Sequence, residues 1–204
     1  MKRLLKKIYR FFFPILNKGQ GNSWRISSKM RGQTMISFYG NNNKVIIGEN
    51  CLLNDVEFFV CGNNNILEIC DNVRIKKNSS LWLEGNSCLK IGTNTGIGSI
   101  KIRIKDGNIV VGDNCMFSAG ILLRNWDGHR VYNLGEELQT NIPGNIIIGN
   151  HVWICENASI IKKCEIGNDS IIAYGSVVTK GCLANCVLAG NPAKVVKENI
   201  SWDY

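Results

Sequence analysis

The chain has 204 residues, 45% of them hydrophobic, which is enough for one elongated domain with a small appendage. Its net charge of +8 is uneven: residues 1–48 carry ten Lys or Arg and no Asp or Glu, so the remainder sums to −2. The basic quarter could meet membrane phosphates, an acidic glycan or a nucleotide cosubstrate. Its apolar run is too short and too interrupted by charge to span a bilayer, and no small-residue cleavage site follows it, so we expect no signal peptide.

Nine cysteines argue against a disulfide scaffold. Their number is odd, and no Cys-x-x-Cys pair occurs. Cys51, Cys115, Cys164 and Cys182 fall at positions where a small inward-facing side chain is expected, as described below. We therefore expect reduced thiols that act as small hydrophobic residues, and a cytoplasmic protein.

Residues 1–18 are expected to form a basic amphipathic helix, with Pro14 ending or kinking it. One interpretation packs this helix against an end of the fold. The alternative is a peripheral contact of residues 1–16 with the inner face of an anionic membrane. Residues 19–44 are rich in Gly, Asn and Ser and are expected to be an irregular basic lead-in.

A six-residue period begins at position 148 and organises the second half of the chain. Its aliphatic positions are Ile148, Ile154, Ile160, Ile166, Ile172 and Val178. Compact residues follow each of these by four, at Val152, Ala158, Cys164, Ser170, Ser176 and Cys182. Residues six apart do not build one face of an α-helix, whereas a hexapeptide period is typical of a parallel β-helix. The pattern therefore predicts an all-β fold.

Three short strands joined by corners would close a triangular coil of about 18 residues, stacked on the next coil at about 4.8 Å. We expect this β-helix to cover residues 45–190. The period starts irregularly, with aliphatic and compact pairs such as Ile47 with Cys51 and Ile91 with Thr95. Residues 191–204 are expected to cap the open end, with one or two helical turns over 193–200.

The period lapses once. It runs through Val111, Phe117 and Leu123, and His129 stands where the next inward aliphatic residue is due. A polar segment, about 130–147, then separates it from the renewed period. Long loops in compact repeats are usually functional.

Acid–base chemistry is the catalytic option that the composition leaves open. Only His129 and His151 are present, so one chain cannot supply a three-histidine zinc site, and no metal is expected. His129 could take a proton from a hydroxyl, with Asp127 or a backbone carbonyl holding its tautomer. His151 is interpreted as structural. Trp153 faces outward on a strand and needs a subunit or a ligand to cover it.

Other site classes find less support. Cys155 has no local base, no glycine-rich phosphate loop occurs, and no nucleic-acid partner is expected without an aromatic β platform.

An ordered set of motifs resembles the hexapeptide-repeat acyltransferases over roughly residues 109–198. It is most similar to the bacterial O-acetyltransferases that modify cell-surface polysaccharides, and more distantly to galactoside and maltose acetyltransferases. The motifs are Ile109–Cys115, Asp127-Gly128-His129, Ile148–Ile154, Gly175–Lys180 and Ala189–Lys194.

The resemblance implies a left-handed β-helix, a homotrimer with active sites between neighbouring prisms, and acetyl-CoA as the donor. It implies that His129 is the base and that Trp153 lines the reaction centre. The expected cofactor-binding residues are Ser176, Thr179, Lys180, Lys194 and Lys197. Asp127 and Tyr174 are expected on the substrate side.

Three departures from the family pattern put the path of the pantetheine arm in doubt. Cys155 replaces a usual glycine, Tyr174 replaces a small residue, and Gly181-Cys182-Leu183-Ala184 replaces Asp-Ile-Pro-Pro. The expected activity is O-acetylation of a saccharide. N-acetylation of an amino sugar and a non-catalytic trimeric β-helix that binds glycan or protein remain the alternatives.

Overall fold

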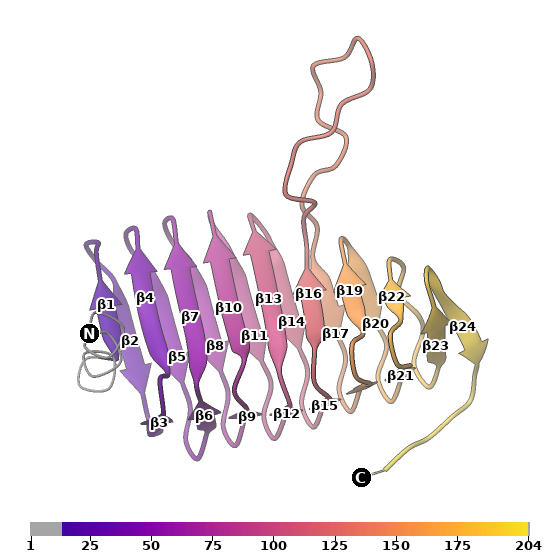
Figure 1. Cartoon of the computed structure of the whole chain (residues 1–204), viewed down its shortest axis with the longest axis horizontal. Coiled ribbons are helices and arrows are strands. Elements are labelled where there is room, and N and C mark those ends of the chain that lie inside the picture. Colours follow the sequence, from indigo (N-terminus) through magenta and orange to yellow (C-terminus); the bar gives the residue numbers. More distant parts are fainter. Residues whose placement is uncertain (1–13, 204) are drawn as a thin grey trace, which may run out of the picture.

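The computed structural model describes residues 14–203. Within this range all regular elements are strands, and they wind into one parallel β-helix whose coils stack along a single axis (Figure 1). Each complete coil adds a strand to each of three parallel sheets, so the sequence prediction of a parallel β-helix is confirmed. No helix in the described range is long and apolar enough to cross a membrane.

The three sheets form the sides of the prism. The first sheet contains β1 (Ile15–Asn17), β4 (Met35–Tyr39), β7 (Val56–Cys61), β10 (Ser79–Glu84), β13 (Ile100–Lys105), β16 (Ile121–Arg124), β19 (Ser159–Ile161) and β22 (Val177–Val178). The second sheet contains β2 (Ser23–Ile26), β5 (Lys44–Ile47), β8 (Ile66–Ile69), β11 (Cys88–Ile91), β14 (Asn108–Val111), β17 (Ile146–Ile148) and β20 (Cys164–Ile166). The third sheet contains β3 (Met30–Arg31), β6 (Leu52–Asn54), β9 (Arg74–Ile75), β12 (Gly96–Ile97), β15 (Met116–Phe117), β18 (Trp153–Ile154), β21 (Ile171–Ile172), β23 (Val187–Gly190) and β24 (Ala193–Lys197).

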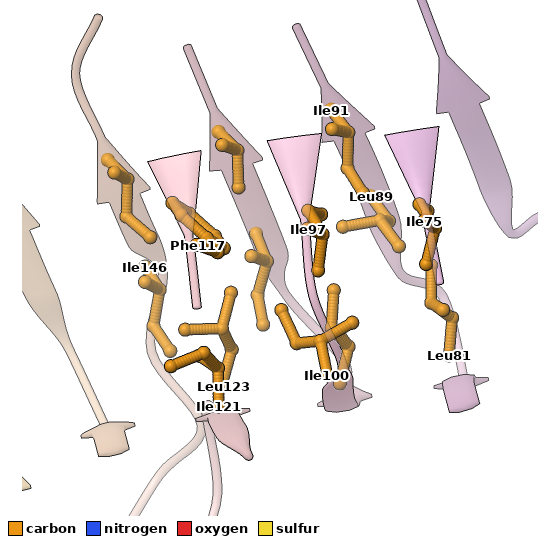
Figure 2. Close-up of a cluster of buried hydrophobic side chains, with 14 of the residues drawn as sticks. Ile75, Leu81, Leu89, Ile91, Ile97, Ile100, Phe117, Ile121, Leu123 and Ile146 are labelled. Atoms are coloured by element: carbon orange, nitrogen blue, oxygen red, sulfur yellow. The ribbon is translucent and has the colours of Figure 1, made fainter. Parts of the chain in front are cut away.

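The axis of the prism is filled by the residues that the six-residue period marks as inward. All six aliphatic positions of the regular stretch, from Ile148 to Val178, are exposed by 1% or less. The compact positions from Val152 to Ser176 are buried as well, and only Cys182 is partly exposed. Figure 2 shows side chains from successive coils, such as Phe117 and Ile97, packing beside one another inside the prism. Stacking therefore buries an apolar face that no single coil could bury.

The coils before the loop are longer than those after it. Ile160 pairs with Val178, 18 residues later, whereas Leu81 pairs with Phe58, 23 residues earlier. The extra residues lengthen the strands of the first sheet and its corners, because β7, β10 and β13 have six residues each. This explains why the six-residue period is irregular there.

The β-helix also begins earlier than the sequence indicated. The expected lead-in of residues 19–44 contains β2, β3 and β4, and Ile15–Asn17 of the expected helix is strand β1. Backbone pairing with the next coil determines these conformations, and local sequence pattern does not reveal it. Residues 1–13, where most of the expected amphipathic helix falls, lie outside the described residues.

The C-terminal cap is a strand and not the expected helical turns. Ala193–Lys197 forms β24, which pairs antiparallel with β23 at the end of the third sheet. The tail then runs back along the prism, where Ile200 and Asn185 exchange hydrogen bonds of 3.0 and 3.1 Å. This arrangement covers part of the last coil and protects its edge from further strand pairing.

Candidate active site

One long loop leaves the prism between β16 and β17 and projects far from it (Figure 1). Its stem is held by the buried side chain of Asn125, whose amide donates to the carbonyl oxygens of Lys105 and Gly144 and accepts from the Lys105 N–H. The loop therefore covers 125–145, starting before the predicted segment of 130–147. His129 lies exposed within it, where the six-residue period lapses. Ile148 takes the inward aliphatic position that the period places at residue 129, and it pairs with Val111 and Ile166.

The outer part of the loop is a hairpin-like arm. Tyr132 and Gln139 form an antiparallel bridge, and the Thr140 N–H donates to the Val131 carbonyl at 2.8 Å. Large apolar side chains on the arm are exposed to solvent: Val131, Tyr132, Leu134, Leu138 and Ile142. Leu134 is fully exposed and Leu138 is 76% exposed. An apolar surface of this kind usually marks an interaction site.

The base of the loop encloses a cavity of about 340 Å³ that contains His129 and Asp127. Its wall also includes Lys105, Asp106, Trp126, Gly128, Arg130, Gln139, Asn141 and Pro143. Gly128 has φ +93°, and a Cβ there would lie 2.7 Å from Arg124 Nη2. The Asp-Gly-His sequence thus needs its glycine for the backbone conformation, whereas the Arg124 guanidinium is the end of a flexible side chain that can shift.

Asp127 anchors the loop and is not hydrogen-bonded to the imidazole of His129. Its Oδ2 accepts from Asn141 Nδ2 at 3.0 Å and lies 3.2 Å from Lys162 Nζ. The Asn141 hydrogen bond, together with the charge of Lys162, lowers the pKa of Asp127 and keeps it a carboxylate at neutral pH. Asn141 Nδ2 also donates to the His129 carbonyl oxygen at 2.7 Å. Asn141 therefore links the two halves of the loop beside the histidine.

Trp153 lies on another side of the prism, facing outward from β18 between Met116 and Ile171. Its indole Nε1 is buried and has no hydrogen-bond partner among the described residues. The wall of the loop cavity does not include Trp153. One chain thus places His129 and Trp153 on different sides of the prism.

The C-terminal tail covers Trp153 and His151. Trp202 is 9% exposed, its ring stacks on the His151 imidazole at 4.1 Å and 4°, and it lies 5.9 Å from the Trp153 ring. Trp202 Nε1 donates to the His151 carbonyl at 2.9 Å, and His151 Nδ1 lies 2.8 Å from Asp169 Oδ1. The contacts of His151 agree with its interpretation as a structural residue. Trp202 is a new component beside Trp153.

The residues expected to hold the cofactor are spread over the last coils. Lys180 lines a cavity of about 460 Å³ on the second-sheet side, together with Ile147, Lys163 and Glu165. Thr179 is half-buried beside Lys180, whereas Lys194 and Lys197 project from the exposed strand β24. Tyr174 is 69% exposed, and its hydroxyl accepts from Asn157 Nδ2 at 3.2 Å.

Ser176 differs from expectation. Its side chain is 1% exposed, and its hydroxyl oxygen accepts from the Gly190 N–H at 3.2 Å inside the prism. The residue is the compact inward member of its hexapeptide, so its hydroxyl cannot line an outer groove. We therefore remove Ser176 from the set of cofactor contacts.

The cysteines are free thiols, as the sequence indicated. Burial raises the pKa of Cys115 to about 11 and that of Cys164 to about 12. Burial also raises the pKa of Cys155, which excludes an activated thiolate there at neutral pH. Within residues 14–203 no group of three or more His, Cys, Asp or Glu residues could hold a metal ion.

The sequence matches known proteins over most of its length. The family described as bacterial transferase hexapeptide (six repeats) matches residues 145–180. The polysialic acid O-acetyltransferase of Neisseria meningitidis is 37% identical over 190 residues, which cover 91% of this chain and 87% of that protein. The chain belongs to the hexapeptide-repeat acyltransferases.

Two crystal structures of this acyltransferase family superpose on nearly the whole chain. The polysialic acid O-acetyltransferase OatWY has a TM-score of 0.85 and 36% identity, and the alignment covers 93% of this chain and 91% of that one. The polysialic acid-specific acetyltransferase NeuO has a TM-score of 0.80 and 33% identity, with 93% and 88% covered. The chain is therefore an acyltransferase by both sequence and fold.

The sequence motifs of this acyltransferase located His129 and Trp153 but missed their surroundings. Asn141 and Lys162 bind Asp127, and Trp202 covers Trp153. The polar character of the loop was the signal for Asn141, whereas Lys162, which lies between β19 and β20, gave none. Trp202 gave no signal, because its contact with His151 spans 51 residues.

Proposed function

We propose that the protein is an acetyl-CoA-dependent O-acetyltransferase that acts on a hydroxyl of a cell-surface saccharide. The observation that carries the proposal is the loop cavity, in which His129 lies on a backbone fixed by Asn141 and by the stem residue Asn125. The relatives' activity is acetyl transfer to a polysaccharide. A positioned histidine provides the general base that such a transfer needs.

The proposed step is direct transfer between two bound substrates. His129 takes the proton of the acceptor hydroxyl while that oxygen attacks the thioester carbonyl carbon. The tetrahedral intermediate then collapses, the carbon–sulfur bond breaks, and the imidazolium returns the proton to the thiolate. Asp127 contributes by holding the loop through Asn141 and Lys162 and not by contacting the imidazole.

Trp153 is the proposed donor to the oxyanion. Its Nε1 has no partner among the described residues, so the hydrogen bond is available without breaking another. Donors that are fixed before the reaction stabilise a developing oxyanion strongly, because they need no reorganisation. Lys180, Lys194 and Lys197 offer positive charge for the CoA phosphates, with Thr179 beside them.

The complete site requires a second copy of the chain, and we propose a homotrimer. His129 sits in the loop between the first and second sheets, whereas Trp153 faces outward from the third. The exposed leucines of the arm need an apolar surface to cover them. Docking of the arm on a neighbouring prism would bury them and bring His129 toward the neighbour's third sheet.

The chemical nature of the acetylated product distinguishes the candidate activities. The purified protein is incubated with labelled acetyl-CoA and a panel of neutral and acidic saccharides. The proposal expects label in a saccharide ester that mild alkali releases. An alkali-stable amide would instead assign N-acetylation, and the absence of both transfer and an acetyl-CoA thermal shift would favour a non-catalytic binding protein.

The proposed location is the cytoplasm, with peripheral contact to the inner membrane face through residues 1–16. The support is the basic and apolar composition of that segment. Removing residues 1–16 should abolish co-sedimentation with anionic vesicles while acetyl transfer in solution persists. Unchanged vesicle binding by the truncated chain would contradict the membrane contact.

A further inference from the structure

A ladder of aromatic and cationic side chains runs along the outer face of the first sheet toward the loop. Phe59, Trp82, Arg103 and Arg124 pair in register on β7, β10, β13 and β16. Their sequence neighbours, such as Phe58 and Leu81, are fully buried in the axis, so the ladder residues face outward. Strands in a sheet lie about 4.8 Å apart, so the four side chains span about 15 Å. We call these four residues together with Trp126 the outer ladder.

The outer ladder combines flat aromatic surfaces with guanidinium groups. The Phe59 and Trp82 rings stack at 5.1 Å and 29°, and Arg103 Cζ lies 5.7 Å from the Trp82 ring centroid. Arg124 Cζ lies 5.2 Å from the Trp126 centroid. These contacts hold the rings and the guanidinium planes in place before any ligand binds, which lowers the entropy cost of binding.

The two guanidinium groups form no ion pair among the described residues, although the charge of Arg124 contributes to the lowered pKa of Asp127. Arg103 donates to Ser80 Oγ at 3.1 Å and to carbonyl oxygens, but neither Arg103 nor Arg124 has an ion pair. Arg124 Nε is buried with no hydrogen-bond partner. The nearby carboxylates of Glu84 and Asp127 are bound to Lys105 and Lys162.

The two positive charges also affect each other. Burial, and after it the positive charge of Arg124, lowers the pKa of Arg103. Two half-buried like charges side by side are unfavourable until an anion binds between or beside them. Guanidinium groups suit carboxylates in particular, because their donors match both carboxylate oxygens.

A hollow of about 300 Å³ lies along this surface beside the loop cavity. Trp82, Arg103, Arg124 and Trp126 line it, together with Glu84 and Ile104. Trp126 also lines the cavity that contains His129, so the two spaces share a wall. A chain molecule that placed one unit at His129 could therefore continue along the first sheet.

We infer that the outer ladder is an extended binding site for an acidic saccharide chain, holding sugar units remote from the hydroxyl that is acetylated. Carboxylates of the chain bind Arg103 and Arg124, and the apolar faces of the sugar rings pack on Trp82 and Trp126. The inference rests on the proposed function for the identity of the chain as acceptor. It adds the prediction that the enzyme prefers long acidic chains to short or neutral ones.

Binding without the donor tests this inference separately from catalysis. Calorimetric titration with polysialic acid, with its short fragments and with neutral dextran is done on the full chain and on its variants. Arg103→Gln with Arg124→Gln removes the cations, and Trp82→Ala removes the aromatic surface. Arg74→Gln is the matched control, because it removes an exposed arginine from the third sheet. His129→Ala is included to separate binding from transfer.

The inference expects tight, salt-sensitive binding of polysialic acid, weak binding of its fragments and none of dextran. The double arginine variant should raise the Kd for polysialic acid about tenfold or more, since it removes two charge-assisted contacts. Trp82→Ala should raise it less, while Arg74→Gln and His129→Ala should leave it unchanged. The His129→Ala variant would then bind polysialic acid but lose acetyl transfer.

Several results would overturn the inference. They are wild-type affinity in the double variant, equal loss in Arg74→Gln, or equal binding of dextran by the wild type. A change of oligomeric state in the Trp82 or arginine variants, measured by sedimentation, would assign the outer ladder to a subunit contact instead. Absence of polysialic acid binding by the wild type would also overturn it, whatever the outcome of the transfer assay.

Discussion

The coils of the prism and the loop at 125–145 differ in how their residues are stabilised. In the coils, apolar side chains such as Ile154 and Phe117 are almost completely buried, and each coil is paired with the next. In the loop, most side chains are exposed, and a few polar contacts around Asn141 and Asn125 hold the backbone. Changes in the coils should therefore affect stability, and changes in the loop should affect activity and assembly.

The largest effect on stability is expected in the coils. Phe117→Ala removes a ring that is 2% exposed at the centre of the prism. The expected loss is about 3–5 kcal/mol in the free energy of unfolding, from lost burial and the remaining cavity. Denaturant unfolding measures it, with the exposed Val196→Ala as control. A loss below 1 kcal/mol would mean that the coils tolerate cavities and would weaken the comparison.

A comparable effect on assembly is expected in the arm of the loop. Leu134→Ser with Leu138→Ser replaces two exposed side chains, so the folded monomer should keep its stability. If a neighbouring prism buries both, each would contribute about 1.5–3 kcal/mol to association. Sedimentation should show dissociation, and acetyl transfer should fall with it. A variant that stays assembled and active would contradict the proposed docking of the arm.

The contrast between the two regions also explains what the sequence could predict. The regular period from Ile148 to Val178 predicted inward positions that the structure confirms, because each 18-residue coil repeats the same three sides. The long coils before the loop hide the period, since Leu81 and Phe58 are 23 residues apart. The strands within residues 15–44 and the C-terminal strand β24 were missed because pairing with other strands determines both.

The candidate site was predictable only in part. Asp127-Gly128-His129 and Trp153 are recognisable by motif, but the contacts of Asn141 and Lys162 with Asp127 require the folded loop. Ser176 lies inward, as its compact position in the period predicted, and only its place in a family motif suggested a contact with the cofactor. The sequence therefore predicts the position of a residue in the coils more reliably than the ligand that the residue contacts.

A smaller effect is expected at the C-terminal tail. Trp202→Ala removes the ring that packs on Trp153 and stacks on His151. Aromatic pairs contribute about 0.5–1.5 kcal/mol, so kcat should fall by up to about tenfold with little change in KM for acetyl-CoA. Trp202→Phe should restore most of kcat, because it keeps an aromatic ring. Equal loss of kcat in both variants would assign the effect to the Nε1 hydrogen bond with His151.

The smallest effect is expected at the buried thiols. Their raised pKa values, about 11 for Cys115 and about 12 for Cys164, keep both thiols neutral below that pH. Iodoacetamide at about pH 8 reacts with thiolates, so both should stay unmodified in the native protein and react after unfolding. Mass spectrometry of peptides checks this. Rapid native alkylation of Cys115 would show that the coils open readily.

The most direct test of the account measures kcat and the unfolding midpoint of His129→Ala together. The proposed base implies that kcat for the best acceptor falls by about 10²–10⁴-fold. The unfolding midpoint and the sedimentation behaviour should match the wild type, because His129 is exposed and its side chain supports no coil. A folded, assembled variant that retains kcat within a few-fold of the wild type would contradict the central claim that the loop carries the chemistry.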